Sequence, residues 1–376
     1  MDAKKILAVY KKQGARIGTK VRTRLAYRKD FSLWYTPGVS VVARHLAKYP
    51  KDARNMSVKK NSVAVISDGS AVLGLGNIGP YGALPVMEGK AHIFKEIADI
   101  DAWPIVLDTQ DSDEIVRVVK AIAPAFGGIN LEDISAPRCF NIERQLIEDL
   151  DIPVMHDDQH GTAIVTLAGL INAAKVVKKD LKKLKVVING AGAAGTAIAK
   201  LLLAAGVKDV TLIDRAGTIH TGRTDLNIHK AELAALTNPR GLHGNLAETI
   251  CGMDVFIGVS GKGLLSMEHV ASMAPRGIVF AMANPDPEIL PDKAKKAGAA
   301  VVATGRSDYP NQINNALVFP GIFRGAFDHG VKKITEENKL RAARALAALI
   351  KKPTADKVIP DILDPRVVRV IARAVH

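Results

Sequence analysis

Two pairs of adjacent acidic residues are the first feature of this sequence that could do chemistry. Glu132–Asp133 follows an apolar run that ends at Leu131, and Asp157–Asp158 follows one that begins at Val154. Both pairs come at the ends of expected strands, where open α/β sheets usually place their ligands. Four carboxylates at neighbouring strand tips would repel one another, and a hard divalent cation such as Mg²⁺ or Mn²⁺ would relieve that repulsion. Either pair alone would more often cap a helix or face solvent, but the two together favour a metal site.

A glycine-rich turn has the full context of a dinucleotide-binding site. A buried strand over 185–189 runs directly into the glycines, a helix follows, and a second strand over 209–213 ends in Asp214. The glycines permit a tight turn beside the pyrophosphate, and an acid about 20 residues further on typically binds the ribose 2′-hydroxyl. Asp214 therefore predicts a preference for NAD, although Arg215 could pair with the 2′-phosphate of NADP. The residues expected at the cofactor are Gly190, Ala191, Gly192, Ala193, Ala194, Gly195, Asp214 and Arg215.

Two weaker signals leave alternatives open. Gly74, Gly76 and Gly79 also spell GxGxxG, but several residues separate them from the preceding strand and Pro80 follows at once. This turn either brings backbone close to a small anionic substrate or is only a tight structural turn. Cys139 falls on the apolar face of an expected helix, so we expect it in the core and not in the chemistry.

The elements along the chain predict an α/β protein with two domains, because 376 residues are too many for one compact core. Apolar strands alternate with amphipathic helices, a pattern typical of parallel sheets. We expect a first domain over 1–160 and a Rossmann-type domain over 161–376, whose last helices, about 320–376, pack back on the first domain. Expected helices include 4–12, 39–48, 163–178, 337–351 and 365–375, and a stiff loop is expected over 31–40.

The composition is that of a soluble globular protein. The net charge is +14, but the basic residues are spread along the chain without a nucleic-acid-binding motif, so we expect no nucleic-acid partner. No apolar run reaches about 18 residues, so no membrane span is predicted. Two cysteines do not make a disulfide framework, which favours a reducing cytoplasm. Residues 3–29 lack acids, but Gly14, Ile17 and Gly18 interrupt the amphipathic helix of a transit peptide.

Beyond these patterns, the sequence resembles malic enzymes of the short bacterial and archaeal type. The resemblance runs from about residue 14 to residue 376. It rests on ordered motifs, among them YTPGVS, SDGSAVLGLGNIGP, GALPVMEGKA, FGGINLEDI, HDDQHGTA, GAGAAG, ANPDPE, ATGRSDYPNQINN and VFPGIFRGA. That family converts (S)-malate to pyruvate and CO₂ with NAD⁺ or NADP⁺ and Mg²⁺ or Mn²⁺, so the resemblance implies this reaction. It also implies a homodimer.

The resemblance also implies roles for particular residues. Tyr35 in YTP would be the general acid and Lys90 in EGKA the general base, with Asp157 as the partner of the lysine. The metal ligands would be Glu132, Asp133 and Asp158, and the substrate would be bound by Lys90, Asn284 and Asn315. One position departs from the larger malic enzymes, since Ala71 stands where they carry an arginine that would hold the substrate carboxylate.

Two other functions remain as alternatives. A non-decarboxylating NAD-dependent hydroxy-acid or amino-acid dehydrogenase on a similar scaffold would not need a metal. A nucleotide-sensing or nucleic-acid-binding protein would bind its nucleotide or nucleic acid without catalysing a reaction.

Overall fold

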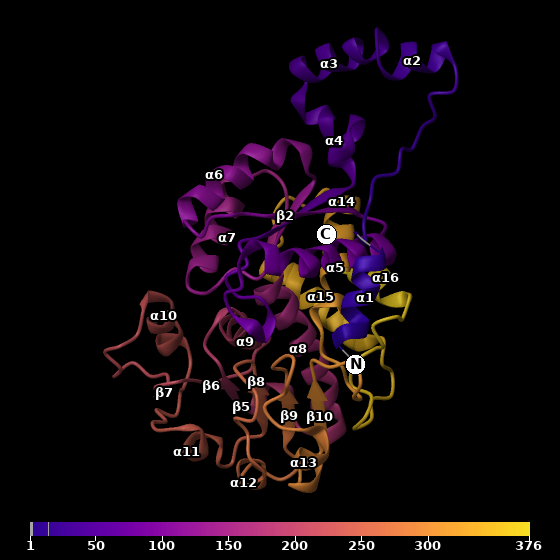
Figure 1. Ribbon diagram of the computed structural model, residues 1–376. Coiled ribbons are helices and arrows are strands. Elements are labelled where there is room, and N and C mark those ends of the chain that lie inside the picture. The colour runs from indigo at the N-terminus through magenta and orange to yellow at the C-terminus, as the bar shows by residue number, and fades with distance from the viewer. Residues whose placement is uncertain (1–2, 14) are drawn as a thin grey trace.

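The computed structural model describes residues 3–13 and 15–376, and two sheets organise them (Figure 1). The first sheet has four strands in the order β2-β1-β3-β4, all paired in parallel. Its strand β1 is buried along its whole length, as expected for an apolar strand covered on both faces. The strands are β1 Ser62–Ser67, β2 Asp101–Val106, β3 Gly128–Leu131 and β4 Val154–His156.

The second sheet has six strands in the order β10-β9-β8-β5-β6-β7, and only the short β7 runs antiparallel. The chain leaves β5 toward β6 on one side and later returns to β8 on the other. The neighbouring strands β5 and β8 therefore flank a topological switch point, where α/β sheets bind ligands. The predicted fold class is confirmed. The strands are β5 Lys185–Asn189, β6 Asp209–Asp214, β7 Gly217–Thr218, β8 Val255–Gly258, β9 Ile278–Ala281 and β10 Val301–Thr304.

Helices cover both faces of the first sheet, and β1 shows how the faces divide. Ala64 and Ile66 point into a core built with α6 and α7, whereas Val63 and Val65 point toward α5, α8 and α14. Cys139 of α7 lies buried in the first of these cores, as the helical period predicted. The bounds are α5 Gly79–Ala98, α6 Ser112–Ile122, α7 Arg138–Asp149 and α14 Phe319–His329.

The helix α8, Asp157–Val177, runs through the main core. Its length and apolar composition would suit a membrane span, but 72% of the qualifying window is buried inside the protein, as in the core helix of a folded domain. The sequence placed its start after Gly161, and that is wrong. The helix begins at Asp157, because carboxylates are favourable in the first turn of a helix.

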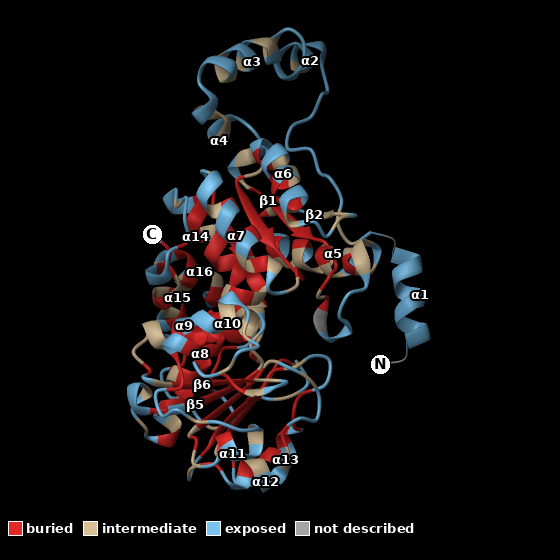
Figure 2. Ribbon diagram, turned by 90° about the vertical axis from the view of Figure 1, so that its left-hand side faces the viewer, coloured by how far each residue is buried: buried red, intermediate tan, exposed pale blue. Residues whose placement is uncertain are grey.

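The last helices of the chain contact helices of the first sheet. The ring of Phe94 in α5 lies 4.7 Å from that of Phe319 and 5.5 Å from that of Phe323, both in α14. Asn172 of α8 donates hydrogen bonds to the carbonyl oxygens of Ala347 and Val358. Figure 2 shows these helices beside the buried first sheet. The remaining two are α15 Glu336–Ala348 and α16 Arg366–Ala374.

Shorter helices surround the second sheet. Of these, α9 follows the glycine-rich turn and packs against α8. They are α9 Ala193–Ala204, α10 Ile228–Leu236, α11 Leu246–Ile250, α12 Met267–Ala271 and α13 Pro291–Lys296.

The N-terminal segment carries α1, Ala3–Gln13, and then an arm that stands away from both sheets (Figures 1 and 2). We define the arm as residues 23–53. Arg22 forms an ion pair with Asp101 just before it, and Arg54 donates a hydrogen bond to the Phe327 carbonyl just after it. The loop expected over 31–40 is wrong in part, because its first residues are helical. The arm contains α2, Arg28–Trp34, and α3, Gly38–Lys48; α4, Ala53–Met56, follows.

Candidate active site

The acidic pairs meet at the edge of the first sheet. Because β3 and β4 are parallel neighbours, the residues that follow their last positions lie at the same edge. One oxygen each from Glu132, Asp133 and Asp158 lies within 4.8 Å of the others, a spacing that a single cation could bridge. The backbone amide of Asp133, at a φ of 54°, donates to Asp158 Oδ2 at 2.7 Å.

Lys90 of α5 contacts this cluster. Its Nζ lies 2.5 Å from Asp157 Oδ2 and 3.0 Å from Glu132 Oε1, and 4.6 Å above the ring of Phe319. Burial alone would lower the pKa of Lys90, but Asp157, Glu132 and Asp158 outweigh it and raise the pKa. The three carboxylates therefore favour the charged form of Lys90.

The same burial acts on the two carboxylates beside the lysine. Burial raises the pKa of Glu132 well above its usual range, although Lys90 opposes the rise, and burial also raises the pKa of Asp157.

Helix α8 must leave room for the Asp157 side chain, and Gly161 does so. A Cβ at Gly161 would lie 1.8 Å from Asp157 Oδ1, so only glycine fits one turn after this aspartate.

A buried network supports the end of β4 beside the acidic cluster, and the sequence did not single it out. Glu143 of α7 accepts hydrogen bonds from the His156 amide and the Gln159 side chain, and pairs with His160 Nε2 at 3.0 Å. Lys339 Nζ of α15 lies 2.9 Å from His160 Nδ1. Burial would raise the pKa of Glu143, but His160 and Lys339 hold it down at about 2. The network ties α7, α8 and α15 to the end of β4.

A cleft of about 900 Å³ opens in front of Lys90 and the acidic cluster, and residues that follow strands of both sheets line it. Asn284 and Asn315, both expected at the substrate, line it. Gly74 of the weaker glycine motif also lines it, and a Cβ there would lie 2.0 Å from the Asn284 carbonyl oxygen, so this turn packs closely against the Asn284 loop. The predicted residues that line the cleft are Lys90, Glu132, Asp133, Asp158, Gly192, Ala193, Ala194, Arg215, Asn284 and Asn315.

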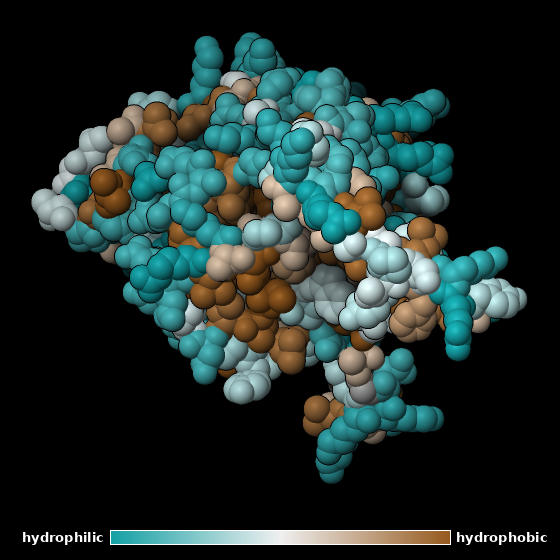
Figure 3. Space-filling model, turned by 90° about the horizontal axis from the view of Figure 1, so that it is seen from above, coloured by the Kyte–Doolittle hydropathy of each residue, from teal (hydrophilic) through white to brown (hydrophobic). Residues whose placement is uncertain are grey.

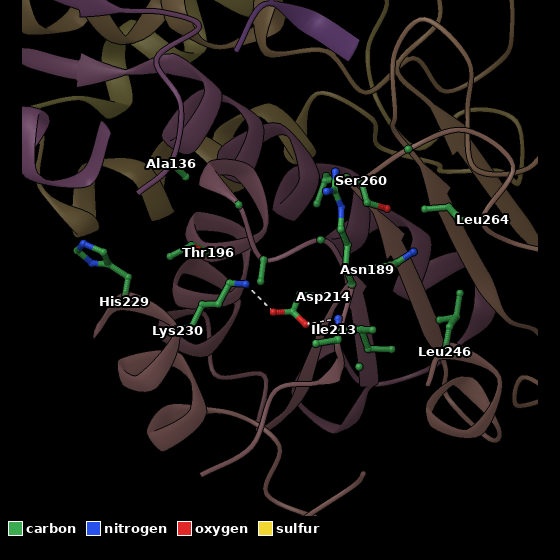
Figure 4. Close-up of a pocket in the computed structure, with 18 of the residues that line it drawn as sticks. Ala136, Asn189, Thr196, Ile213, Asp214, His229, Lys230, Leu246, Ser260 and Leu264 are labelled. Atoms are coloured by element: carbon green, nitrogen blue, oxygen red, sulfur yellow. Dashed lines mark hydrogen bonds and ion pairs between the residues drawn. The ribbon is translucent and has the colours of Figure 1, made fainter. Parts of the chain in front are cut away.

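The second pocket, of about 970 Å³, lies at the switch point of the second sheet (Figure 4). Gly190, Gly192 and Asp214 line it. A Cβ at Gly195 would lie 1.7 Å from the Gly190 carbonyl oxygen, which explains why this position is glycine. Gly192 and Arg215 line both this pocket and the first cleft, so the two adjoin at these residues.

Asp214 is not a free carboxylate in this pocket. Arg223 Nη1 lies 2.8 Å from Oδ1, Lys230 Nζ lies 2.5 Å from Oδ2, and the Ala216 amide donates to Oδ1. Burial would raise the pKa of Asp214, but Arg223 and Lys230 lower it. Figure 4 shows Lys230 turned toward Asp214. Neither cation was expected from the sequence, because Arg223 lies in an irregular segment after β7 and Lys230 lies in α10, and nothing in the sequence pairs either of them with Asp214.

Two residues complete the comparison with the sequence. Tyr35, the expected acid, is 61% exposed on the arm and is not among the residues that line the cleft. Arg16, which the sequence did not indicate, does line the cleft beside Ala71 and Lys90. Its buried Nε has no hydrogen-bond partner among the described residues.

Comparisons with known proteins point to one family. Residues 159–376 match the family model "Malic enzyme, NAD binding domain", and residues 15–113 and 109–147 match "Malic enzyme, N-terminal domain". The NAD-dependent malic enzyme of Geobacillus stearothermophilus is 56% identical over 96% of this chain and 76% of its own. The NADP-dependent malic enzyme of Halomonas elongata is 49% identical over 89% of this chain and 79% of its own. The structure of the NAD-dependent malic enzyme from Thermotoga maritima has a TM-score of 0.95 at 48% identity, and covers 100% of this chain and 99% of that chain.

The fold, the two adjoining clefts and these relatives define a nicotinamide-dependent oxidoreductase. The family models span both sheets, and the chain belongs to the malic enzyme family. The resemblance stated from the sequence is confirmed. Family membership does not favour the alternative of a non-decarboxylating dehydrogenase.

Proposed function

We propose that this protein oxidatively decarboxylates (S)-malate to pyruvate and CO₂, reducing NAD⁺ or NADP⁺, with Mg²⁺ or Mn²⁺ as the metal. The single observation that carries the proposal is the cleft in which Lys90 and the carboxylate cluster open directly onto the dinucleotide-binding turn. Such a cleft suits a substrate that must touch a metal, a base and a nicotinamide at once. In the cell we expect a cytoplasmic homodimer without nucleic-acid or membrane partners.

The residues present fit a divalent cation. Glu132, Asp133 and Asp158 offer hard oxygen ligands within 4.8 Å of one another, the ligand type that Mg²⁺ and Mn²⁺ prefer. A bound cation would supply Lewis acidity toward the substrate oxygens and would cancel part of the carboxylate charge that holds the Lys90 proton.

The role of each remaining side chain would follow from its position. Lys90 Nζ would take the proton from the C2 hydroxyl of malate as hydride leaves C2 for the nicotinamide, and Asp157 would hold the lysine in place. Asn284 and Asn315 would orient the substrate from the second sheet's side of the cleft. After CO₂ is lost, Tyr35 would deliver a proton to C3, which completes pyruvate.

Arg16 is our candidate for the group that holds the substrate carboxylate where Ala71 cannot. It lines the cleft, and its guanidinium lies beside Gly89, one residue before the base. Arginine binds carboxylates through paired N–H donors, and the buried Nε of Arg16 has a donor to offer.

Metal dependence is tested by removing one ligand. Asp158→Asn should lower malate turnover by more than about 100-fold, since residues that only support a metal ligand already contribute about 10–100-fold. It should also weaken Mn²⁺ binding, measured by calorimetry on the folded variant. Asp149→Asn, which changes an exposed carboxylate paired with Lys120, is the control. Full turnover by the wild-type protein in EDTA would contradict the proposed requirement for a metal.

Supplying reaction intermediates directly distinguishes the role of the acid, Tyr35, from that of the base, Lys90. Lys90→Arg keeps the buried cation but cannot accept a proton, so oxaloacetate reduction by NADH and malate oxidation should both fail. Tyr35→Phe should still reduce oxaloacetate but lose exchange of the C3 protons of pyruvate by about 10²–10⁴-fold, the usual contribution of a general acid. Exchange at the wild-type rate in Tyr35→Phe would show that another group is the acid.

The role of Arg16 predicts a defect in substrate binding. Arg16→Gln should raise KM for malate at least about tenfold, because a charge-assisted hydrogen-bond pair is lost, and should leave KM for the dinucleotide within about twofold. Arg117→Gln, an exposed change on α6, is the matched control. An unchanged KM for malate in Arg16→Gln would rule out this carboxylate contact.

A further inference from the structure

Glu288 is a buried acidic side chain that the proposed mechanism does not use. Hydrophilic residues dominate the surface of the molecule seen from above (Figure 3), which is where charged side chains normally lie. Glu288, between β9 and α13, is instead completely buried. Burial raises the pKa of Glu288 to about 7, against the opposing effect of backbone N–H donors. Because burying a carboxyl group is unfavourable, a residue that only filled this space would be apolar.

The two carboxyl oxygens of Glu288 join the ends of two strands. Oε1 accepts a hydrogen bond from the Ser260 amide at 3.2 Å, and Oε2 accepts one from the Ala283 amide at 3.1 Å. Ser260 follows β8 and Ala283 follows β9, which are parallel neighbours. A carboxylate offers two acceptor oxygens and no donor, so it suits two backbone N–H groups that point toward one site.

Gly258, the last residue of β8, makes room for this carboxyl group. A Cβ at Gly258 would lie 2.3 Å from Glu288 Cδ, so any side chain there would displace the carboxyl group. The backbone adds a further contact, because the Leu265 amide donates to the carbonyl oxygen of Glu288 at 3.1 Å. We call residues 259–265 the Ser260 loop and residues 282–287 the Asn284 loop. Glu288 therefore ties these two loops to each other.

The two loops lie where the two clefts adjoin. Val259 and Ser260 line both the cleft beside Lys90 and the pocket beside Asp214, and Asn284 lines the cleft. A dinucleotide crosses the switch point of such a sheet. Its adenosine end is expected at Asp214, after β6, so its nicotinamide end is expected at the loops that follow β8 and β9. The spacing of the two loops therefore sets the distance between the nicotinamide and a substrate held by Asn284.

We propose that Glu288 is a positioning residue that fixes the Ser260 loop against the Asn284 loop, so that nicotinamide and substrate meet at the distance that hydride transfer requires. The inference rests on the proposed function for the role of Asn284 and for the hydride transfer itself. Glu288 is not among the residues that line either cleft, so it acts through the two loops. A small misplacement of reacting groups slows a reaction strongly, so the loss of Glu288 affects turnover more than it affects binding of the adenosine half.

Kinetics of Glu288→Gln test the positioning role. The glutamine amide loses one acceptor oxygen and turns a donor toward a backbone N–H, so one of the two loops should be released. We expect kcat with malate to fall about 10- to 100-fold. The primary deuterium isotope effect of [2-²H]malate on kcat should rise, because hydride transfer then limits the rate. Glu148→Gln, an exposed change on α7, is the matched control and should keep the wild-type kcat and isotope effect.

A purely structural role of Glu288 predicts a different result. It would only reduce the fraction of folded enzyme, so kcat would fall while KM for malate and the isotope effect stayed unchanged. That pattern would overturn the proposal.

Gly258→Ala is an independent variant, because it displaces the carboxyl group without changing it. It should raise the isotope effect as Glu288→Gln does. The double variant should be slower than the slower single variant by no more than about twofold, since both changes disrupt the same contact. Wild-type kcat in Gly258→Ala, or fully additive losses in the double variant, would overturn the proposal.

Ligand binding separates this inference from the proposed function. NADH carries the nicotinamide and ADP-ribose lacks it, so Glu288→Gln should weaken NADH binding at least about tenfold more than ADP-ribose binding, measured by calorimetry. Equal weakening of both ligands, or loss of ADP-ribose binding in both Glu288→Gln and Gly258→Ala, would assign Glu288 to the fold as a whole and overturn the positioning role. A wild-type protein that binds both ligands but does not oxidise malate would contradict the proposed function alone, and the binding ratio would still decide the role of Glu288.

Discussion

The site depends on one buried lysine among four acidic side chains. Lys90 pairs with Asp157 and Glu132, and Asp133 and Asp158 lie at the same sheet edge. Removing such charges from water is unfavourable unless they are paired, so the pairing fixes where α5, α8 and the ends of β3 and β4 stand relative to one another. Phe319 of α14 lies against Lys90, and the missing side chain at Gly161 leaves room for Asp157, so both positions favour the ion pair.

The sequence predicted those parts of the site that are local in the chain. The acidic pairs directly follow apolar strands, and parallel strands place such residues at one edge, so the strand pattern alone grouped the four carboxylates. The choice of Glu132, Asp133 and Asp158 among them came from the resemblance, and these three lie together in the structure. The dinucleotide turn was equally predictable, since its strand, glycines and helix are consecutive. Lys90 and Tyr35 came from the resemblance, because a single lysine or tyrosine carries no periodic signal.

What the sequence missed depends on contacts between distant segments. In the sequence alone, nothing distinguishes Glu143 from a surface residue of an amphipathic helix. Its network forms only in the fold, where α15 places Lys339 beside His160. Arg16 precedes the first sheet by tens of residues, and Lys230 follows Asp214 across an irregular segment. The loop expected at FSLWYTPGVS was partly wrong because the proline constrains only its neighbours, whereas residues 28–34 have no helix-breaking residue.

The position of α14 has a consequence for how the chain folds. Phe94 completes its packing only when Phe319 and Phe323 arrive, so the first sheet cannot bury its α5 face until most of the chain has been synthesised. Contacts of such large sequence separation slow folding and leave apolar surface exposed in the meantime. We therefore expect this protein to be most prone to aggregation, and most dependent on chaperones, while only its N-terminal half has been synthesised.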